Sequence, residues 1–570
     1  MSCGGSRGPR PDFACRRWSP SGCFTPATRL ANASRTTPAF SRDPLPDQPA
    51  EYTPLAYRTD IVYNLEVRRR SPLLVILSVL ACFLLSLPAQ AAPRRRHAPR
   101  KAKPAKPTEP PASSLAEALE RAARRPPARP NGLSIEIADV ATGERVFSRN
   151  PDAPETIASL TKLFSTAAAL HFLGPEYKFK TTFWRRGEIT DGVLTGSLLV
   201  VGGGDPNISG RFYHDDYNAV FDKWAEGLKA AGVTRVNGDL VLNDSFFDSV
   251  LRHPEWPAGQ EAKWYQAPVS ALAYNDGVVL VGIRPGTRAG GPAAVSIEPQ
   301  TGTLRALSSA RTVGRRGNVR LAVGRADGSN AVTISGTVPM RSVWWSTPIA
   351  VEDPTGFFGG ALKNRLKAAG IELSGQVVRK DVKPDTAWTL VAETDSDLMA
   401  TLAVINKRSQ GFYAEQTFKT LAAEKAGKGT WENAISLEKE FLAALALDPT
   451  RYNLHDGSGL SPQNRVSAAD IVRFLRAMET NPNGAAWKVT LATPGDPEST
   501  LRHRLHDPVA RDRVAAKTGS IRGVSTLAGY ATGLSGKIYA FAILLNGPGV
   551  WDGGGHAFQD RLLQALIHNG

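Results

Sequence analysis

The sequence predicts an α+β fold in which a domain of helices and strands is interrupted by a mostly β insert. Short strand-like runs separated by glycine fill the chain from about 181 to 380, which is typical of β structure. Helical periodicity precedes this stretch and returns after it. At 570 residues the chain exceeds one hydrophobic core. Because strands and helices are grouped rather than alternating, we expect an interrupted α+β domain.

Residues 67–91 have the layout of a signal peptide. Three arginines precede an apolar run, Pro72 to Leu87, and the small-residue segment Ala89-Gln90-Ala91 follows it. The run is too short to favour a transmembrane helix, so we expect export with cleavage near Ala91. A retained membrane anchor is the alternative. We interpret residues 1–66 as disordered or not part of the native protein, with translation beginning near Val67.

The net charge of +16 is concentrated near the start of the chain. Residues 92–113 form a basic linker whose lysines and arginines are mixed with proline, so it predicts a solvated tether. A polyanion-binding arm is the alternative, and the linker could contact a membrane or anionic wall polymers. We expect no nucleic-acid partner. All four cysteines precede Ala92, so the rest of the chain needs no disulfide or thiol chemistry.

Helical and strand patterns follow in order after the linker. A helix is expected from Ser114 to Arg125, since Pro126 ends it, and a β-hairpin with one buried face follows over 133–147. The next helix begins at Ser159 and ends at Gly174-Pro175. Its apolar positions recur at helical spacing, at Leu160, Leu163, Phe164, Ala167 and Leu170.

The insert is expected to hold strands, and the second half of the main domain is expected to be mainly helical. The strand-like runs are 197–206, 239–244, 277–283, 319–324 and 331–336. One short helix carrying Leu362 and Leu366 ends at Gly370. Further helices are predicted at 398–406, 412–423, 468–478 and 557–567, and strands at 526–532 and 538–545.

The first chemical motif is Ser159-Leu160-Thr161-Lys162. Residues three apart lie on one face of a helix, so the Lys162 amine can reach the Ser159 hydroxyl. Lysine can activate a serine if burial or nearby positive charge lowers its pKa. The N–H groups at the helix start can help to hold an oxyanion. The alternative is a capping serine followed by a surface lysine.

The second motif is Lys517-Thr518-Gly519-Ser520, in a strand-like run. Glycine would let a substrate lie along a strand edge, and the lysine could anchor a carboxylate. A plain hairpin turn is the alternative. The two motifs in this order, one on a helix and one on a strand, are far less probable by accident than either alone.

These motifs give the chain from about Ser114 to its end a resemblance to a known family, the class C low-molecular-mass penicillin-binding proteins. The segment ASLTKLF resembles the nucleophile helix of these D-Ala-D-Ala carboxypeptidases and endopeptidases, and AAKTGS resembles their substrate strand. The segment NKRSQGFYAEQ resembles their middle motif, and DGSGLS, 456–461, resembles a characteristic turn. The long separation between Ser159 and Ser409 favours this group over the class A β-lactamases.

The resemblance implies a β-lactamase/transpeptidase-like domain, with an antiparallel sheet flanked by helices and a helical subdomain. That domain would occupy residues 115–183 and 376–570, and residues 184–375 would form the inserted accessory β domains. The implied activity is serine-type D-Ala-D-Ala carboxypeptidase or endopeptidase action on peptidoglycan stem peptides, in the periplasm or cell envelope. β-Lactams would be covalent inhibitors. No metal or cofactor is implied.

The resemblance also implies a role for each motif residue. Ser159 would attack the carbonyl between two D-alanines, Lys162 would be the base, and Ser409 would relay a proton to the leaving amine. Lys517 and Thr518 would bind the terminal carboxylate. Gly519 belongs to the same substrate-binding strand, and the N–H groups of Ser159 and Ser520 would form the oxyanion hole.

The middle motif departs from the family pattern. The family has Ser-x-Asn, whereas this chain has Ser409-Gln410-Gly411. The missing amide would normally bind substrate and lysine, so Gly411 predicts weakened transition-state stabilisation. The alternative for Ser409 is a helix cap for the residues from Phe412 onward.

Other candidates have simpler explanations. His503 and His506 lack the glutamate of a zinc-protease motif, and the glycine run 202–206 lacks the lysine of a phosphate-binding loop, so we expect no metal site and a tight turn. Trp256, Trp264 and Tyr265 are expected to pack in a core, with a substrate-facing rim as the alternative. The competing functions are a β-lactam or ester hydrolase on the same fold and a catalytically weak peptidoglycan-binding protein.

Overall fold

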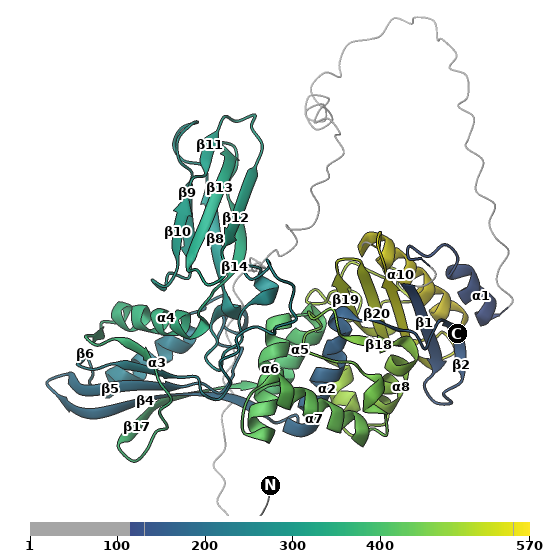
Figure 1. The fold of residues 1–570 in the computed structure, drawn as a ribbon, viewed down its shortest axis with the longest axis horizontal. Helices are drawn as coiled ribbons and strands as arrows, with labels where there is room; N and C mark the ends of the chain where they lie inside the picture. Colours follow the sequence, from purple (N-terminus) through teal and green to yellow (C-terminus); the bar gives the residue numbers. More distant parts are fainter. Residues whose placement is uncertain (1–113, 130–131, 551) are drawn as a thin grey trace, which may run out of the picture. The chain divides into compact units, whose positions relative to one another are not determined.

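The computed structural model describes residues 114–129, 132–550 and 552–570 (Figure 1). The signal peptide, the basic linker and the preceding 66 residues that the sequence predicts lie outside these ranges. Within the described ranges, no helix has both the length and the apolar character needed to cross a membrane.

A five-stranded antiparallel sheet joins the two ends of the described chain, in the order β19-β20-β21-β1-β2. Its strands are β1 (Leu133–Asp139), β2 (Arg145–Arg149), β19 (Val514–Ile521), β20 (Val524–Thr532) and β21 (Ile538–Asn546). Helix α10 (Asp552–Asn569) packs on β20 and on α1 (Leu115–Ala122), while α8 (Ala468–Glu479) packs on β21 and β1. Because helices contact these central strands, β20 and β21 are almost wholly buried. The predicted hairpin, closing strands and closing helix are confirmed. The expectation of one buried face for the hairpin is wrong for β1, which lies inside the sheet and is buried on both faces.

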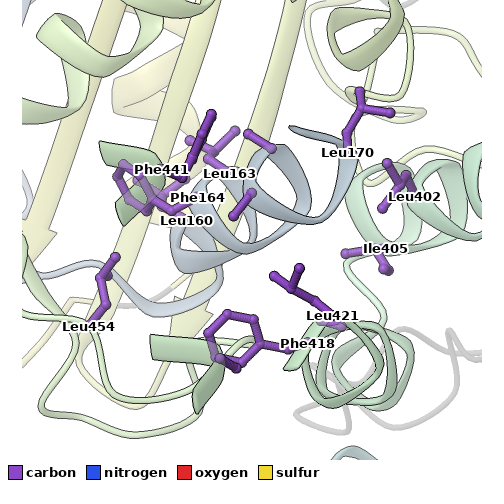
Figure 2. Packing of buried hydrophobic residues seen from close by; sticks show 14 of the residues in the cluster. Leu160, Leu163, Phe164, Leu170, Leu402, Ile405, Phe418, Leu421, Phe441 and Leu454 are labelled. Atoms are coloured by element: carbon purple, nitrogen blue, oxygen red, sulfur yellow. The ribbon is translucent and has the colours of Figure 1, made fainter. Parts of the chain in front are cut away.

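Helix α2 (Thr161–Leu173) is the buried axis of a helical region. It contacts α5 (Leu398–Arg408), α6 (Gly411–Ala426) and α7 (Trp431–Ala444). Every residue from 161 to 170 is buried, as expected for a helix that is enclosed on all sides. Figure 2 shows Leu163, Phe164 and Leu170 of α2 among apolar side chains from these three helices. This packing fixes the helix that carries the first motif.

The insert begins with a seven-stranded sheet flanked by two helices. Its strands are β4 (Lys178–Thr190), β5 (Val193–Val201), β6 (Arg235–Val236), β7 (Leu240–Asn243), β15 (Glu372–Leu373), β16 (Val377–Arg379) and β17 (Trp388–Asp397). Helices α3 (Ala219–Ala230) and α4 (Pro354–Ala368) contact each other, and Phe221, Trp224 and Phe358 pack between them. Helix α4 is confirmed. Helix α3 was not predicted, although its buried apolar residues have helical spacing.

The remaining strands of the insert form a smaller β module of two sheets. One is β14-β8-β9, with β8 (Val278–Arg284), β9 (Ala294–Glu298) and β14 (Trp345–Ala350). The other pairs β10 (Arg305–Ser308), β11 (Arg311–Val313) and β12 (Arg320–Arg325) with the central β13 (Ala331–Pro339). We refer to residues 278–350 as the β module. Its strands confirm the mostly β character expected for the insert.

The chain enters and leaves the insert at adjacent points. Strand β4 pairs with β17, and the backbone N–H of Leu398 donates to the carbonyl of Tyr177 at 3.0 Å. The domain boundaries expected from the sequence, at residues 183 and 376, would divide this sheet, because residue 183 lies inside β4 and strand β17 follows residue 376. We therefore propose that the inserted region runs from Lys178 to Asp397, with the transpeptidase-like domain on either side.

Candidate functional site

Ser159 lies in a 3-10 turn, Ala158–Leu160, directly before α2. The Nζ atom of Lys162 is 3.0 Å from the Ser159 Oγ atom. Ala158 has a φ of 48°, a left-handed conformation that non-glycine residues rarely adopt. Gly459 lies against this turn, and a Cβ atom there would come within 1.9 Å of the Ala158 carbonyl oxygen. The predicted helix start is thus a strained turn that presents the hydroxyl.

Lys162 is buried, with only 1% of its surface exposed. Its Nζ atom also donates to the Ser458 carbonyl oxygen at 2.5 Å. Burial lowers the pKa of Lys162 to about 8, and the neighbouring Asp456 and Glu415 oppose that shift. An amine with such a pKa is partly neutral near physiological pH and can accept a proton from the serine.

The turn that carries Ser458 is built around the buried carboxylate of Asp456. This carboxylate accepts four hydrogen bonds, from the N–H groups of Gly459 and Ser461 at 2.7 Å, from Asn464 Nδ2 at 2.9 Å and from Trp256 Nε1 at 3.0 Å. The DGSGLS segment is therefore a rigid turn, and the carbonyl of its Ser458 faces Lys162. Trp256 belongs to the insert and also packs edge-on against Trp431, which agrees with core packing.

Glu415 of α6 holds the same turn from the opposite side. Its carboxylate accepts hydrogen bonds from the N–H of Ser458 at 2.8 Å, the N–H of Gly457 at 3.1 Å and Trp431 Nε1 at 2.8 Å. Burial and the charge of Asp456 raise the pKa of Glu415 to about 7. Sequence reasoning missed this residue, because an isolated glutamate in a helix gives no signal of a contact with a distant turn.

A second serine and lysine meet at the end of α5. The Nζ atom of Lys517 donates to the Ser409 Oγ atom at 2.8 Å and to the Thr518 carbonyl at 2.7 Å. Burial and the charge of Lys162 hold the pKa of Lys517 well below its usual value. Ser409 ends α5 in a left-handed conformation, with φ 59° and ψ 34°. Gln410, not Ser409, occupies the N-cap position of α6.

Strand β19 runs beside the Ser159 turn because Gly519 has no side chain. A Cβ atom there would lie 2.3 Å from Thr526 Oγ1, 2.8 Å from the Ile157 carbonyl oxygen and 3.1 Å from the Ser159 nitrogen. Thr518 donates to Thr500 Oγ1 at 3.0 Å and is half-buried, and Ser520 is exposed. The structure therefore brings both motifs to one place, with two buried lysines beneath two partly exposed serines.

Gly411 begins α6 and faces the same turn. A Cβ atom at this position would lie 3.6 Å from Ser458 Cβ and 3.8 Å from the Tyr265 carbonyl oxygen, both ordinary contact distances. Trp264 and Tyr265 are half-buried and pack edge to face, so Tyr265 borders the site from the insert. A Cβ atom at Gly411 therefore meets no steric conflict.

The remaining sequence candidates lie outside this site. His503 and His506 are exposed, and the described residues include no group of three or more metal-ligating side chains. In the glycine run, Asp205 is buried and accepts hydrogen bonds from the Asn207 N–H and the Ser396 hydroxyl. This is the tight turn that the sequence favoured.

Comparison with known proteins decides the family. The family model of the D-Ala-D-Ala carboxypeptidase 3 (S13) family matches residues 115–564. The chain belongs to this family. It is a serine-type D-alanyl-D-alanine carboxypeptidase of the penicillin-binding group, acting on peptidoglycan, as the sequence predicted.

Individual relatives agree with this family. The chain is 32% identical over 432 residues to a D-alanyl-D-alanine carboxypeptidase of Actinomadura sp., a match that covers 72% of this chain and 77% of that protein. It is 26% identical over 398 residues to the D-alanyl-D-alanine carboxypeptidase DacB of Haemophilus influenzae, covering 68% of this chain and 80% of that protein. The crystal structure of penicillin binding protein 4 from Haemophilus influenzae has the same fold, with a TM-score of 0.69, 22% identity, and coverage of 79% and 99%.

Proposed function

We propose that Ser159 is the nucleophile of this carboxypeptidase and that Lys162 is its general base. The observation that carries the proposal is the distance of 3.0 Å between Lys162 Nζ and Ser159 Oγ, with the lysine buried and its pKa lowered to about 8. Neutral Lys162 takes the hydroxyl proton as Ser159 Oγ attacks the carbonyl between two D-alanines. The N–H groups of Ser159 and Ser520 receive the developing oxyanion.

Ser409 and Lys517 complete the first half-reaction. As the C–N bond breaks, the Ser409 hydroxyl gives its proton to the leaving nitrogen of the terminal D-alanine. The proton that Lys162 took from Ser159 then replaces it on Ser409, so the half-reaction gains and loses no proton. Lys517, with Thr518, binds the terminal carboxylate, whose negative charge favours the protonated form of this lysine. Gly519 lets the peptide backbone lie along β19. Water then attacks the acyl-serine carbonyl and gives a proton to Lys162, and Lys162 passes that proton to Ser159 Oγ as the ester bond breaks.

The chemistry and the relatives support the proposed substrates, and the signal-peptide layout of residues 67–91 supports the proposed location. We propose that the enzyme acts on peptidoglycan stem peptides in the periplasm or cell envelope after export, and that β-lactams acylate the same serine. In a cross-linked stem peptide, the carbonyl of a D-alanine is joined to an amine of a second stem peptide. Cleavage of that cross-link by an endopeptidase uses the same steps. The basic linker is proposed to act as a tether that can contact anionic wall polymers or the membrane.

The test is release of D-alanine from a stem pentapeptide. Wild-type protein should release it, and Ser159→Ala should lower the rate by about a thousandfold or more, because nucleophile and base act as one unit. Ser436→Ala, a control on the exposed face of α7, should keep the wild-type rate. Full activity in Ser159→Ala would contradict the assignment. Incubation with a cross-linked muropeptide dimer then measures the endopeptidase share.

A further inference from the structure

One end of the β module combines exposed arginines with exposed apolar side chains. Three turns meet there, 284–291, 314–319 and 340–344. The Gly290 N–H donates to the Thr312 carbonyl, Arg341 donates to the Gly317 carbonyl, and the Met340 N–H donates to the Val313 carbonyl. We call these turns, with the adjoining residues 311–313 and 320, the tip of the module. Figure 1 shows the strands β11 and β13 that lead into it.

The tip carries a high density of positive charge. Its arginines are all exposed and are Arg284, Arg288, Arg311, Arg315, Arg316, Arg320 and Arg341. The segments that form the tip contain no aspartate or glutamate. Such a one-sided charge attracts an anionic partner over a distance of about one Debye length.

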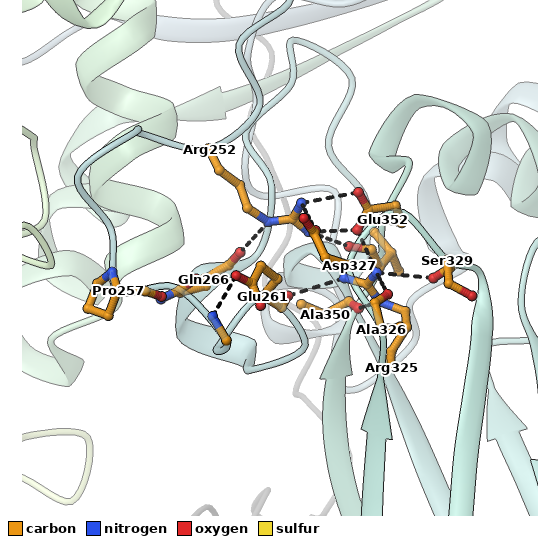
Figure 3. A network of polar contacts seen from close by, with 12 residues as sticks. Arg252, Pro257, Glu261, Gln266, Arg325, Ala326, Asp327, Ser329, Ala350 and Glu352 are labelled. Carbon is orange, nitrogen blue, oxygen red and sulfur yellow. Dashed lines mark hydrogen bonds and ion pairs between the residues drawn. The ribbon is translucent and has the colours of Figure 1, made fainter.

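The acidic residues of the module lie at its other end. Asp327 and the buried Arg325 belong to a network with Arg252 and Glu352, which Figure 3 shows. Glu298 of β9 lies opposite Leu280 in the strand pairing, towards the end of β8 that is away from Arg284. The network joins this end of the module to the segment before Tyr265, and the tip lies at the opposite end of the module.

Large apolar side chains are exposed among the tip arginines. They are Val343 at 89%, Trp344 at 50%, Val319 at 42% and Met340 at 39% exposure. A soluble polyanion needs the arginines but gains little from these side chains, and an apolar protein partner needs no excess of positive charge. An anionic lipid surface uses both, because tryptophan favours the membrane interface and arginine pairs with lipid phosphates.

We propose that the tip docks the enzyme on the surface of an anionic phospholipid membrane. Val343 and Trp344 insert at the headgroup level, and the arginines contact phosphates around them. The binding is peripheral and weakens with salt.

The test uses the full chain in flotation with phosphatidylglycerol vesicles, with phosphatidylcholine vesicles for comparison. Wild type should bind the first kind more tightly. Val343→Ser/Trp344→Ser and Arg315→Glu/Arg316→Glu should each lower the partition coefficient by at least about tenfold. The matched controls are Val489→Ser/Leu534→Ser, which removes exposed apolar side chains elsewhere, and Arg186→Glu/Lys380→Glu, which makes the same charge change elsewhere. Both controls should bind like wild type.

Backbone hydrogen exchange, measured on the full chain, identifies which segments contact the membrane, even if segments outside the tip also bind. Vesicles of phosphatidylglycerol should slow exchange in 314–319 and 340–344. D-Alanine release should be unchanged in the tip variants, which shows that they are folded. The proposal is overturned if wild type does not bind, if the tip variants bind like wild type, or if exchange slows only elsewhere. A further outcome is that wild type and Val343→Ser/Trp344→Ser bind soluble polyglycerol phosphate equally and neither binds vesicles. That outcome would assign the tip to wall polymers and would also overturn the membrane proposal.

Discussion

Lys162 and Ser458, which lie 296 residues apart in sequence, are joined by a hydrogen bond of 2.5 Å from the lysine Nζ to the serine carbonyl oxygen. The carbonyl has little freedom, because Glu415 binds the N–H groups of Gly457 and Ser458. Glu415 therefore acts on the reaction through Ser458 and Lys162, as a positioning residue.

Replacing Glu415 with glutamine should lower the acylation rate and move its pH dependence. The neutral amide binds the two N–H groups less well, which should lower kcat/KM by about tenfold to a hundredfold. The charge of Glu415 raises the pKa of Lys162, so removing it should move the pH profile to lower pH. The measurement is β-lactam acylation over a pH series. A slower rate with an unmoved profile would indicate a merely structural role, and Glu226→Gln on the exposed face of α3 is the control.

The wild-type rate of acylation should rise with pH, with a midpoint near 8. Below the lowered pKa of Lys162 the amine is protonated and cannot accept the serine proton, and above it the base is available. Because Lys162, Lys517 and Glu415 interact, the midpoint belongs to the group as a whole. Stopped-flow measurement of β-lactam acylation from about pH 6 to about pH 10 checks this. A rate that does not change with pH, or a midpoint near that of an ordinary lysine, would refute the assignment of Lys162 as base.

Replacing Gly411 with asparagine should raise the acylation rate by about tenfold, by restoring the amide of the family's middle motif. The substitution starts without a clash, because a Cβ atom at Gly411 makes only ordinary contacts with Ser458 and Tyr265. Gly411→Ala is the control, since it adds the Cβ atom without the amide and should leave the rate near wild type. Equal rates for all three proteins would show that the amide has no part in this site.

Glu438 of α7 should be a source of instability. It is 1% exposed, and neither carboxyl oxygen has a hydrogen-bond partner among the described residues. Burial, Asp456 and Glu415 raise its pKa well above the usual value. Glu438→Met should therefore increase the free energy of unfolding by about 1–3 kcal/mol.

The gain from Glu438→Met should depend on pH. In the folded state the carboxyl holds its proton to higher pH than in the unfolded state, so its burial becomes more costly as pH rises above about 4.5. Urea unfolding should show a larger gain at pH 8 than at pH 4.5. Glu440→Met, on the exposed face of the same helix, should change stability little. A destabilised Glu438→Met would mean that the carboxyl has a partner that stabilises it.

Periodic patterns predicted helices and strands well where the spacing of apolar residues along the chain matches the repeat of the element. The apolar spacing from Leu160 to Leu170 and the alternation at Ile135 and Ile137 each gave an element that the structure contains. Helix α3 has the same kind of spacing, but the glycine-rich strands around it favoured a uniform β interpretation. The turn at Ala158 was missed because it packs against Gly459, which is distant in sequence, and no local pattern indicates that contact.

The site was predictable only where residues act as short motifs. Ser159 with Lys162, and Lys517 with Thr518, are neighbours in sequence, and their chemistry can be stated from that spacing. Glu415 supports the site through a contact with Gly457 across 42 residues, and Trp256 through a contact with Asp456 across 200 residues. Such contacts exist only after the helices and the insert have packed, so no local pattern indicates them.

The most direct test of the account is to locate the covalent adduct after reaction with a β-lactam. Digestion and tandem mass spectrometry should find the adduct on the peptide that spans Ala158 to Lys162, on the Ser159 hydroxyl alone, with none in Ser159→Ala. An adduct on another residue, or one that persists at full occupancy in Ser159→Ala, would contradict the central claim that this hydroxyl is the nucleophile.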